Sequence, residues 1–396
     1  MEIYISNPGF VCSCGKSPEE FMKNLTSGNQ NGISKARCDL VCENSDREFF
    51  VGKIQDEMLN SVEDKFATRF LQVLDTALDG VRSAVEKAVA KYGAERVAVC
   101  VGQCDNGSYL SFTNHKEFFT KGEFPADYDL KAQGADYPAT YISKKFGLNG
   151  VSLSFATACS SSASAIIKGK ELIKAGIADA VVAGGGDVDS DTVLLGFDSL
   201  EAVSHEKANP FSKNRSGITL GEGASFFVLS KDDIDGTGIV LAGTGESSDA
   251  NHMTAPLADG SGAKQAMESA LKDAGLEPSE IDYVNLHGTG THLNDSMEGK
   301  GVDLVFGDYK VPCSTIKSMT GHTLGGAASL ELAACFYAIK MQKLPVQAWD
   351  KVQDEEIPVL NIVSDSDCCK DKEIKICMSN SFAFGGCNAS LIIKKA

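Results

Sequence analysis

Short apolar runs alternate with amphipathic stretches along the whole chain. The runs are rich in valine, leucine and phenylalanine, as is typical of buried strands, and they lie at 97–101, 151–155, 180–183, 225–229 and 239–242. Between such runs, apolar side chains recur at helical spacing, most clearly over 162–175 and 262–274. Strands that alternate with helices predict a layered α/β protein.

The order of these segments repeats faintly. Residues 1–14 and 238–252 each place a strand before a turn of small residues, and a later strand in each half leads into a helix rich in small residues. We therefore predict two duplicated halves, 1–235 and 236–396, divided in a polar turn near residue 235. A functional site is expected at their seam, where strand ends and helix starts from both halves converge.

Cys159 lies where a strand gives way to a helix, in Ser154-Phe-Ala-Thr-Ala-Cys-Ser-Ser-Ser-Ala-Ser-Ala165. The start of a helix carries partial positive charge and free N–H groups, which favour the nucleophilic thiolate. Small neighbours leave room for a substrate. Most buried cysteines are structural thiols, so this segment alone leaves that alternative open.

His287 and His322, two of only six histidines, occupy similar surroundings. Each lies in a turn of glycine and threonine, the first after an apolar strand and the second before a helix. Two neutral imidazole N–H groups directed at one thioester oxygen would stabilise an enolate. We expect Lys317 and Glu331 to hold His322 by an ion pair and hydrogen bonds, although an ordinary helix salt bridge is the alternative.

Five motifs in a fixed order identify a family. They are Ala156-Thr-Ala-Cys-Ser-Ser161, Ser247-Ser-Asp-Ala-Asn-His-Met-Thr254, His287-Gly-Thr-Gly-Thr291, Lys317-Ser-Met-Thr-Gly-His322 and Asn380-Ser-Phe-Ala-Phe-Gly-Gly-Cys-Asn388. Over nearly its whole length the chain resembles the elongating β-ketoacyl-[acyl-carrier-protein] synthases of the thiolase superfamily. The resemblance implies the five-layered αβαβα thiolase fold. It also implies an acyltransferase that joins an acyl thioester to malonyl-[acyl-carrier-protein] by decarboxylative Claisen condensation, in fatty-acid or related polyene or polyketide synthesis.

The resemblance also implies catalytic roles. Cys159 would accept the acyl chain as a thioester. His287 and His322 would bind the malonyl thioester oxygen and promote decarboxylation, with Lys317 and Glu331 supporting His322. No metal and no cofactor is implied, because phosphopantetheine belongs to the acyl carrier protein that delivers the substrate.

Further roles concern access to the nucleophile. The backbone N–H of Phe384 would complete an oxyanion hole with that of the cysteine, and its ring would gate the acyl pocket. Asp249 and His252 would belong to a second loop that moves with this gate. Thr289 and Thr291 would bind the pantetheine arm of the carrier protein.

Several positions depart from the family pattern. Ala383 stands where glycine is usual, and Cys387 stands where threonine is usual. The usual Arg-Pro-Phe-Asp-x-x-Arg-Asp-Gly appears as Asn209-Pro-Phe-Ser-Lys-Asn-Arg-Ser-Gly217, which keeps Arg215. Glu201 lies where some relatives carry an arginine that docks the carrier protein. These changes point to a specialised pathway such as polyene or polyketide assembly.

The net charge of the chain limits the partners that it is expected to bind. A net charge of −17 opposes binding to nucleic acid or to anionic membranes. An acidic carrier protein would then need a local basic patch, for which Lys65, Arg69, Lys144 and Lys145 are candidates. The resemblance implies a dimer, either of two identical chains or with a ketosynthase-like subunit.

Most of the thirteen cysteines are predicted to be reduced core thiols, because no export signal is visible. No run of about 18 apolar residues predicts a membrane helix. We therefore expect a cytoplasmic protein without membrane insertion. Cys12, Cys14, Cys38 and Cys42 have only a weak resemblance to a zinc site, and no metal is predicted.

Two rival functions remain at this point. A non-catalytic partner subunit, like the chain-length factors that pair with ketosynthases, would lack the nucleophile. A degradative thiolase would use Cys387 as a second, acid/base cysteine. Release of CO₂ from malonyl-carrier protein separates a condensing enzyme from both.

Overall fold

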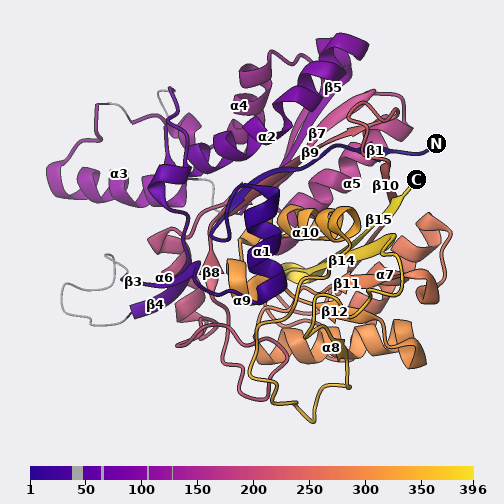
Figure 1. The fold of residues 1–396 in the computed structure, drawn as a ribbon. Coiled ribbons are helices and arrows are strands. Elements are labelled where there is room, and N and C mark those ends of the chain that lie inside the picture. Colours follow the sequence, from indigo (N-terminus) through magenta and orange to yellow (C-terminus); the bar gives the residue numbers. More distant parts are fainter. Residues whose placement is uncertain (38–47, 64–66, 105–106, 127) are drawn as a thin grey trace.

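The computed structural model describes residues 1–37, 48–63, 67–104, 107–126 and 128–396 (Figure 1). Its strands are β1 (Tyr4–Ile5), β2 (Gly9–Cys12), β3 (Ile33–Arg37), β4 (Glu48–Gly52), β5 (Val97–Gly102), β6 (Ser152–Phe155), β7 (Ala180–Asp187), β8 (Leu220–Gly221), β9 (Gly223–Ser230), β10 (Ile239–Ser248), β11 (Tyr283–Asn285), β12 (Pro312–Ser314), β13 (Asn361–Ile362), β14 (Ile376–Phe382) and β15 (Cys387–Lys395). Its α-helices are α1 (Pro18–Ser27), α2 (Arg69–Tyr92), α3 (Ser108–Lys121), α4 (Tyr137–Phe146), α5 (Ser161–Lys174), α6 (Asp191–Ser199), α7 (Ser261–Ala274), α8 (His292–Phe306), α9 (Lys317–Thr320) and α10 (Ala327–Met341).

The strands form one large mixed sheet. Its order is β13-β12-β11-β14-β15-β10-β1-β9-β7-β5-β6, with β2 paired to β9, and a small separate sheet joins β3, β4 and β8. The short β1 pairs antiparallel with both β9 and β10 and so joins the strands of the first half to those of the second. The boundary near residue 235 falls in the connection from β9 to β10, and the division into two halves stays a prediction.

Successive side chains along each strand point to opposite faces of the sheet, and each face packs against a different layer of helices. Val182 and Val228 face α2 and α4, whereas their neighbours Val181 and Leu229 face α5 and α10. On the C-terminal strands the inward residues also pack on α5 and α10, and the opposite face packs on α7 and α8. Figure 1 shows the resulting five layers, with α5 and α10 in the middle. The strands of the one sheet form two of these layers, one around β5, β7 and β9 and the other around β14 and β15. Strands buried on both faces explain the continuous apolar runs of the sequence.

The structure contains the predicted helices, with small shifts at their ends. The helix expected over 162–175 is α5, and the one expected over 262–274 is α7. Gly102, the last residue of β5, fixes the start of α5, because a Cβ there would lie 2.2 Å from the backbone of Ser161. This close approach sets the turn before α5 directly against the sheet.

One stretch, Leu324–Met341, has the length and composition to cross a membrane, but 89% of it is buried inside the protein. It consists of a short 3-10 turn and α10, in the middle layer between the strands of the two halves. Tight packing on both sides explains its apolar composition, as for other core helices.

Candidate active site

Cys159 lies in the 3-10 turn Ala158–Ser160, between β6 and α5. Ala158 adopts a left-handed conformation with φ of 51°, a strained geometry that the hydroxyl of Ser161 stabilises by donating to the Ala158 carbonyl at 2.6 Å. The cysteine is buried and lines a cavity of about 270 Å³. The turn thus presents the sulfur at the floor of this cavity.

His287 lies in the loop after β11, and His322 lies in the loop after α9. Both loops belong to the C-terminal half. The Nε2 atom of His322 lies 3.1 Å from the Cys159 sulfur. The two imidazole rings are nearly perpendicular, with centroids 5.3 Å apart. Donor atoms of the three side chains all lie within 4.8 Å of one another. The structure therefore brings together three residues that the sequence separates by up to 163 positions.

The backbone of His322 is held by the N-terminal half. Its N–H donates to the Thr219 carbonyl at 2.7 Å, and its carbonyl accepts from the Gly221 N–H at 3.0 Å. Three residues later, the Gly325 N–H donates to the carboxylate of Asp187 at 2.7 Å. Asp187 ends β7, so both anchors belong to the half that also carries the cysteine.

Both imidazoles present an Nε2–H to the cavity. Lys317 donates to Nδ1 of His287 at 3.2 Å, so the ring proton of His287 is assigned to Nε2. Nδ1 of His322 is buried and has no partner among the described residues, and a proton there would be an unsatisfied buried donor. Its proton is therefore also assigned to Nε2. Two N–H donors directed at one place form a site for a developing oxyanion.

Lys317 contacts a different histidine from the one predicted. Its Nζ donates to the carbonyl of His287 at 2.6 Å as well as to the ring, and it forms a buried ion pair with Glu331 on α10. No hydrogen bond to His322 is found for either residue among those described, so their support of His322 stays a prediction. Burial raises the pKa of Glu331 to about 7, although Lys317 opposes the shift.

Replacing Lys317 with alanine should slow malonyl decarboxylation about tenfold, less than the 10²–10³-fold loss expected for removing an oxyanion donor itself. The reason is that His287 would lose the partner that fixes its tautomer. The variant would also leave the Glu331 carboxylate buried without a partner, at a cost of about 3–5 kcal/mol in unfolding free energy.

The double variant Lys317→Met with Glu331→Gln separates these effects, because it removes both charges. Thermal unfolding should return towards that of the parent protein while CO₂ release stays slow. Full decarboxylation in the double variant would contradict a positioning role for Lys317.

The resting cysteine is a thiol. Burial raises the pKa of Cys159 to about 11, although Lys317 and the backbone N–H groups of Phe384 and Cys159 lower it. Burial, followed by the charge of Lys317, holds the pKa of both His287 and His322 well below the ordinary value. The sequence predicted a thiolate stabilised by the helix start. In the structure desolvation outweighs that effect, and neutral imidazoles stand beside a neutral thiol.

Alkylation of Cys159 by iodoacetamide should therefore rise about tenfold per pH unit from pH 7 to pH 10 without levelling off, since a raised pKa leaves little thiolate below it. A free thiol of ordinary pKa, near 8.5, levels off by about pH 10 and serves as the reference. Mass spectrometry of the Cys159 peptide gives the rate. A plateau reached below pH 8 would show that the site stabilises the thiolate after all.

Two carboxylates of α8 were missed by the sequence reasoning. Glu298 accepts from the backbone N–H groups of His287 and Gly288, both at 2.7 Å, and burial raises its pKa to about 8. Asp295 accepts from the N–H of Gly290 at 3.2 Å. Together they hold the glycine-rich turn after β11. Their spacing of three residues on one helix, directly behind that turn, was the available signal.

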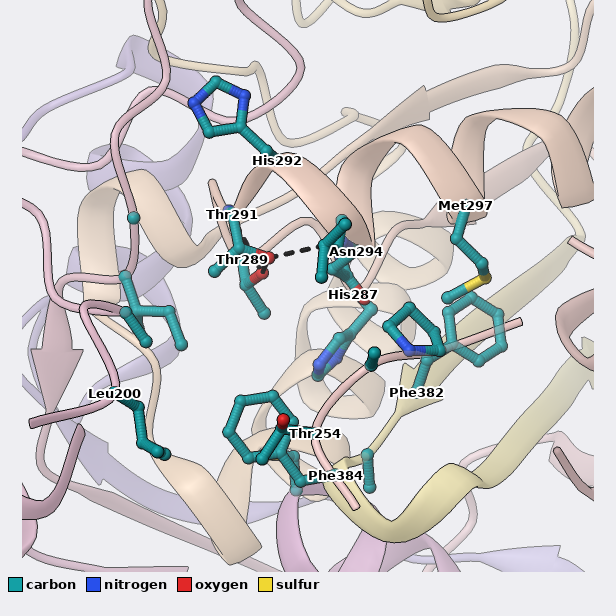
Figure 2. A pocket seen from close by; sticks show the side chains of 18 of the residues that line it. Leu200, Thr254, His287, Thr289, Thr291, His292, Asn294, Met297, Phe382 and Phe384 are labelled. Atoms are coloured by element: carbon teal, nitrogen blue, oxygen red, sulfur yellow. Dashed lines mark hydrogen bonds between the residues drawn. The ribbon is translucent and has the colours of Figure 1, made fainter. Parts of the chain in front are cut away.

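Thr289 and Thr291 line the cavity between its floor and its mouth. Their hydroxyl oxygens lie 3.1 Å apart, and that of Thr291 also caps α8 by accepting from the Asn294 N–H. Figure 2 shows the two threonines on the same side of the cavity as His287, with Leu200 and Phe384 across from them. Polar hydroxyls on one wall and apolar side chains on the other suit a narrow amide-containing chain.

Phe384 begins a 3-10 turn after β14, and its ring stacks on Phe197 with centroids 5.7 Å apart. Two backbone hydrogen bonds join this turn to the loop after β10, from Asp249 N–H to the Gly386 carbonyl at 2.9 Å and from Gly385 N–H to the Met253 carbonyl at 2.7 Å. The two loops are therefore joined to each other, and their predicted joint movement stays a prediction.

The loop after β10 is itself ordered by side chains. Asp249 accepts from the N–H of Leu257 at 3.0 Å and from the amide of Asn388 at 2.7 Å. His252 lines the cavity and accepts from the N–H of Thr254 at 3.1 Å. Asp249 itself is buried and does not line the described cavity.

Comparison with known proteins decides the family. A family model described as "Beta-ketoacyl synthase, N-terminal domain" matches residues 2–233, and its counterpart for the C-terminal domain matches residues 239–348. The chain belongs to the β-ketoacyl synthase family. A 3-oxoacyl-[acyl-carrier-protein] synthase 2 of Staphylococcus aureus is 30% identical, with 100% of this chain and 98% of the relative covered. Nodulation protein E of Rhizobium meliloti is 37% identical, and the match covers 65% of each protein.

Solved ketosynthases share the fold of this β-ketoacyl synthase. The complex of a ketosynthase (ApeO) with its chain length factor (ApeC) from Xenorhabdus doucetiae gives a TM-score of 0.90 at 35% identity, covering 100% of this chain and 98% of the other. The ishigamide ketosynthase/chain length factor gives 0.89 at 26% identity, covering 100% and 99%. The predicted thiolase-like fold is confirmed, and it is the fold of a soluble enzyme.

The positions that depart from the family pattern have ordinary structural roles in this synthase. Ala383 has φ of −102°, which any residue adopts, so its methyl group adds no backbone strain. Arg215, which the altered segment 209–217 keeps, is buried and pairs with Asp354. Cys387 begins β15 and does not line the described cavity, so the second cysteine of a degradative thiolase is not where that reaction would need it.

The predicted basic patch is largely neutralised. Arg69 forms ion pairs with Glu222 and Asp56, both at 2.6 Å, and Lys145 pairs with Asp75. Lys65 lies outside the described residues, as do Cys38 and Cys42, and Lys144 is exposed. Two of the four candidate cations are thus already paired within the chain, because each meets a carboxylate that the sequence alone did not place beside it.

Proposed function

We propose that this β-ketoacyl synthase condenses an acyl thioester with malonyl-[acyl-carrier-protein], releasing CO₂ and giving 3-oxoacyl-[acyl-carrier-protein], in fatty-acid or related polyene or polyketide synthesis. One observation carries the proposal: the Cys159 sulfur and two imidazole Nε2–H donors converge at the floor of one cavity. A nucleophile supports acyl transfer, and the two donors support formation of an enolate.

In the first half-reaction the Cys159 sulfur attacks the acyl thioester carbonyl. The backbone N–H groups of Phe384 and Cys159 lower the pKa of this sulfur, which supports a role for them as the oxyanion hole of the tetrahedral intermediate. The carbon–sulfur bond to pantetheine then breaks, and the thiol proton leaves with the pantetheine sulfur. The acyl chain remains on Cys159 as a thioester.

In the second half-reaction malonyl thioester enters the same cavity. The Nε2–H groups of His287 and His322 donate to its thioester oxygen, and the bond to the carboxylate breaks to release CO₂ and an enolate. The enolate carbon attacks the acyl-enzyme carbonyl, and the bond to Cys159 breaks. The cysteine leaves as a thiolate that takes a proton from water, which restores the resting state.

The substrates would arrive on the phosphopantetheine arm of an acyl carrier protein, with no other cofactor. The hydroxyls of Thr289 and Thr291 are placed to bind the amides of that arm. The curated relative is named for a synthase acting on acyl carrier protein, and the structural relatives are complexes of a ketosynthase with a chain length factor. These support a dimer, with an identical chain or a ketosynthase-like subunit. The cytoplasm is the proposed location of this dimer.

The deciding experiment supplies malonyl-carrier protein labelled in its free carboxylate together with an acyl-carrier protein. A condensing enzyme releases labelled CO₂, and mass spectrometry finds the 3-oxoacyl product on the carrier. A thiolase would act on acyl thioesters without releasing CO₂, and a non-catalytic subunit would do neither. Absence of both CO₂ and product from the assembled enzyme would refute the proposed function.

A further inference from the structure

Three large apolar side chains stand exposed around the mouth of the cavity. Leu200, Met253 and Leu293 have exposed fractions of 54%, 77% and 59%, and exposed apolar side chains that gather at one place are typical of a surface that binds a partner. Leu200 and Leu293 line the cavity, and Met253 lies between the cavity-lining residues His252 and Thr254. We call these three residues the apolar rim.

The apolar rim comes from three separate elements that the fold gathers at one place. Leu200 follows α6, Met253 belongs to the loop after β10, and Leu293 lies in the first turn of α8. Figure 2 shows Leu200 on the opposite side of the cavity from the start of α8. An entering chain would therefore pass between apolar residues on both sides.

Charge is scarce at this mouth. Among the residues found to line the cavity, Glu201 is the sole aspartate, glutamate, lysine or arginine, and its side chain is exposed. The cavity lining therefore offers an acidic partner no charge attraction, and a partner that docks at the mouth has to be held there by other contacts. Two of the cations predicted to attract such a partner, Arg69 and Lys145, are already paired with carboxylates of the same chain.

Cys159 is only 5% exposed at the floor of the cavity, so a substrate attached to a protein has to enter as a narrow arm while the protein body stays outside. The body must then rest on the residues that surround the mouth. We propose that the apolar rim is the docking surface for the acyl carrier protein, which meets it with apolar side chains beside its phosphopantetheine attachment.

This inference rests on the proposed function and replaces the basic patch expected from the sequence. Apolar contacts are not screened by salt, whereas attraction between exposed charges falls within about 8–10 Å at physiological ionic strength. A small cluster of apolar anchors also suits a partner that has to leave after each transfer.

The test compares two acyl donors. Acylation of Cys159 is followed by mass spectrometry with acyl-carrier protein and with the acyl thioester of N-acetylcysteamine, which carries no protein. The ratio of the two second-order rate constants measures docking alone, because any damage to the site lowers both. Met253→Glu and Leu293→Glu should each lower this ratio at least tenfold.

Two control variants complete the design. Met253→Leu keeps an apolar side chain and should hold the ratio within twofold of the parent value. Val359→Glu introduces the same charge at another exposed apolar residue, 67% exposed and outside the rim, and should also leave the ratio unchanged. Raising salt from 50 to 500 mM should change the parent ratio less than threefold.

An unchanged ratio in both glutamate variants, or a parent ratio that falls more than tenfold with salt, would overturn the docking surface while leaving the proposed function intact. If neither donor acylates Cys159 in the parent protein, the proposed function itself fails. The two failures are therefore distinguishable in one experiment.

Discussion

Cys159→Ala should abolish acyl-enzyme formation and condensation, by at least about 10³-fold, while CO₂ is still released from malonyl-carrier protein. The thioester bond to the acyl chain requires the sulfur. Decarboxylation requires only a place for the enolate oxygen, and the Nε2–H groups of His287 and His322 remain in the variant. Loss of the thiol group also opens space at the cavity floor, so malonyl thioester can still enter.

Intact-protein mass spectrometry with labelled acyl-carrier protein measures the first activity, and trapped CO₂ measures the second. Cys387→Ala is the matched control: its thiol lies outside the described cavity, and both activities should persist. If Cys159→Ala lost both activities together, the cysteine would be needed for decarboxylation, and the two half-reactions could not be assigned to separate groups.

His322→Ala should produce the reverse pattern, with decarboxylation lowered about 10²–10³-fold and a labelled acyl-enzyme still formed at Cys159. The imidazole is neutral and its pKa is held well below the ordinary value by burial and by Lys317, so its contribution is an N–H donor and not a charge. Acyl transfer is expected to be slowed, because the 3.1 Å contact with the sulfur is lost, but it should not be abolished.

His322→Gln tests the donor role directly, since an amide N–H reaches in the same direction. It should recover part of the decarboxylation rate that alanine loses. His287→Ala should match His322→Ala in decarboxylation, because the two donors share one oxygen. A His322→Ala protein that decarboxylates normally but cannot be acylated would require the histidine to act as a base for the cysteine.

Apolar runs predicted the strands well because β5, β7 and β9 are buried on both faces and so lack polar alternation. The ordered motifs predicted which side chains meet, including Cys159 and His322. The sequence could not show which histidine Lys317 contacts. That contact depends on the relative position of two loops that are thirty residues apart in the chain.

The other features that the sequence did not predict depend on which groups the fold buries and brings together. The thiol of Cys159 is neutral because desolvation outweighs the helix start, and the degree of desolvation depends on the folded cavity. Arg69 was expected to attract a partner, but Glu222, 153 residues away, pairs with it. Glu298 was missed because its partners are backbone N–H groups, which leave no trace in the pattern of side chains.

The anchoring of His322 has a consequence for how the enzyme is assembled. Its backbone is held by Thr219 and Gly221, and the following turn is held by Asp187, all on the half that carries the nucleophile. The C-terminal half folded in isolation would contain His322 but would lack the hydrogen bonds that fix its backbone. Catalytic competence therefore depends on the packing of the His322 loop against β7 and the residues around β8, and it arises only once these distant parts of the chain meet.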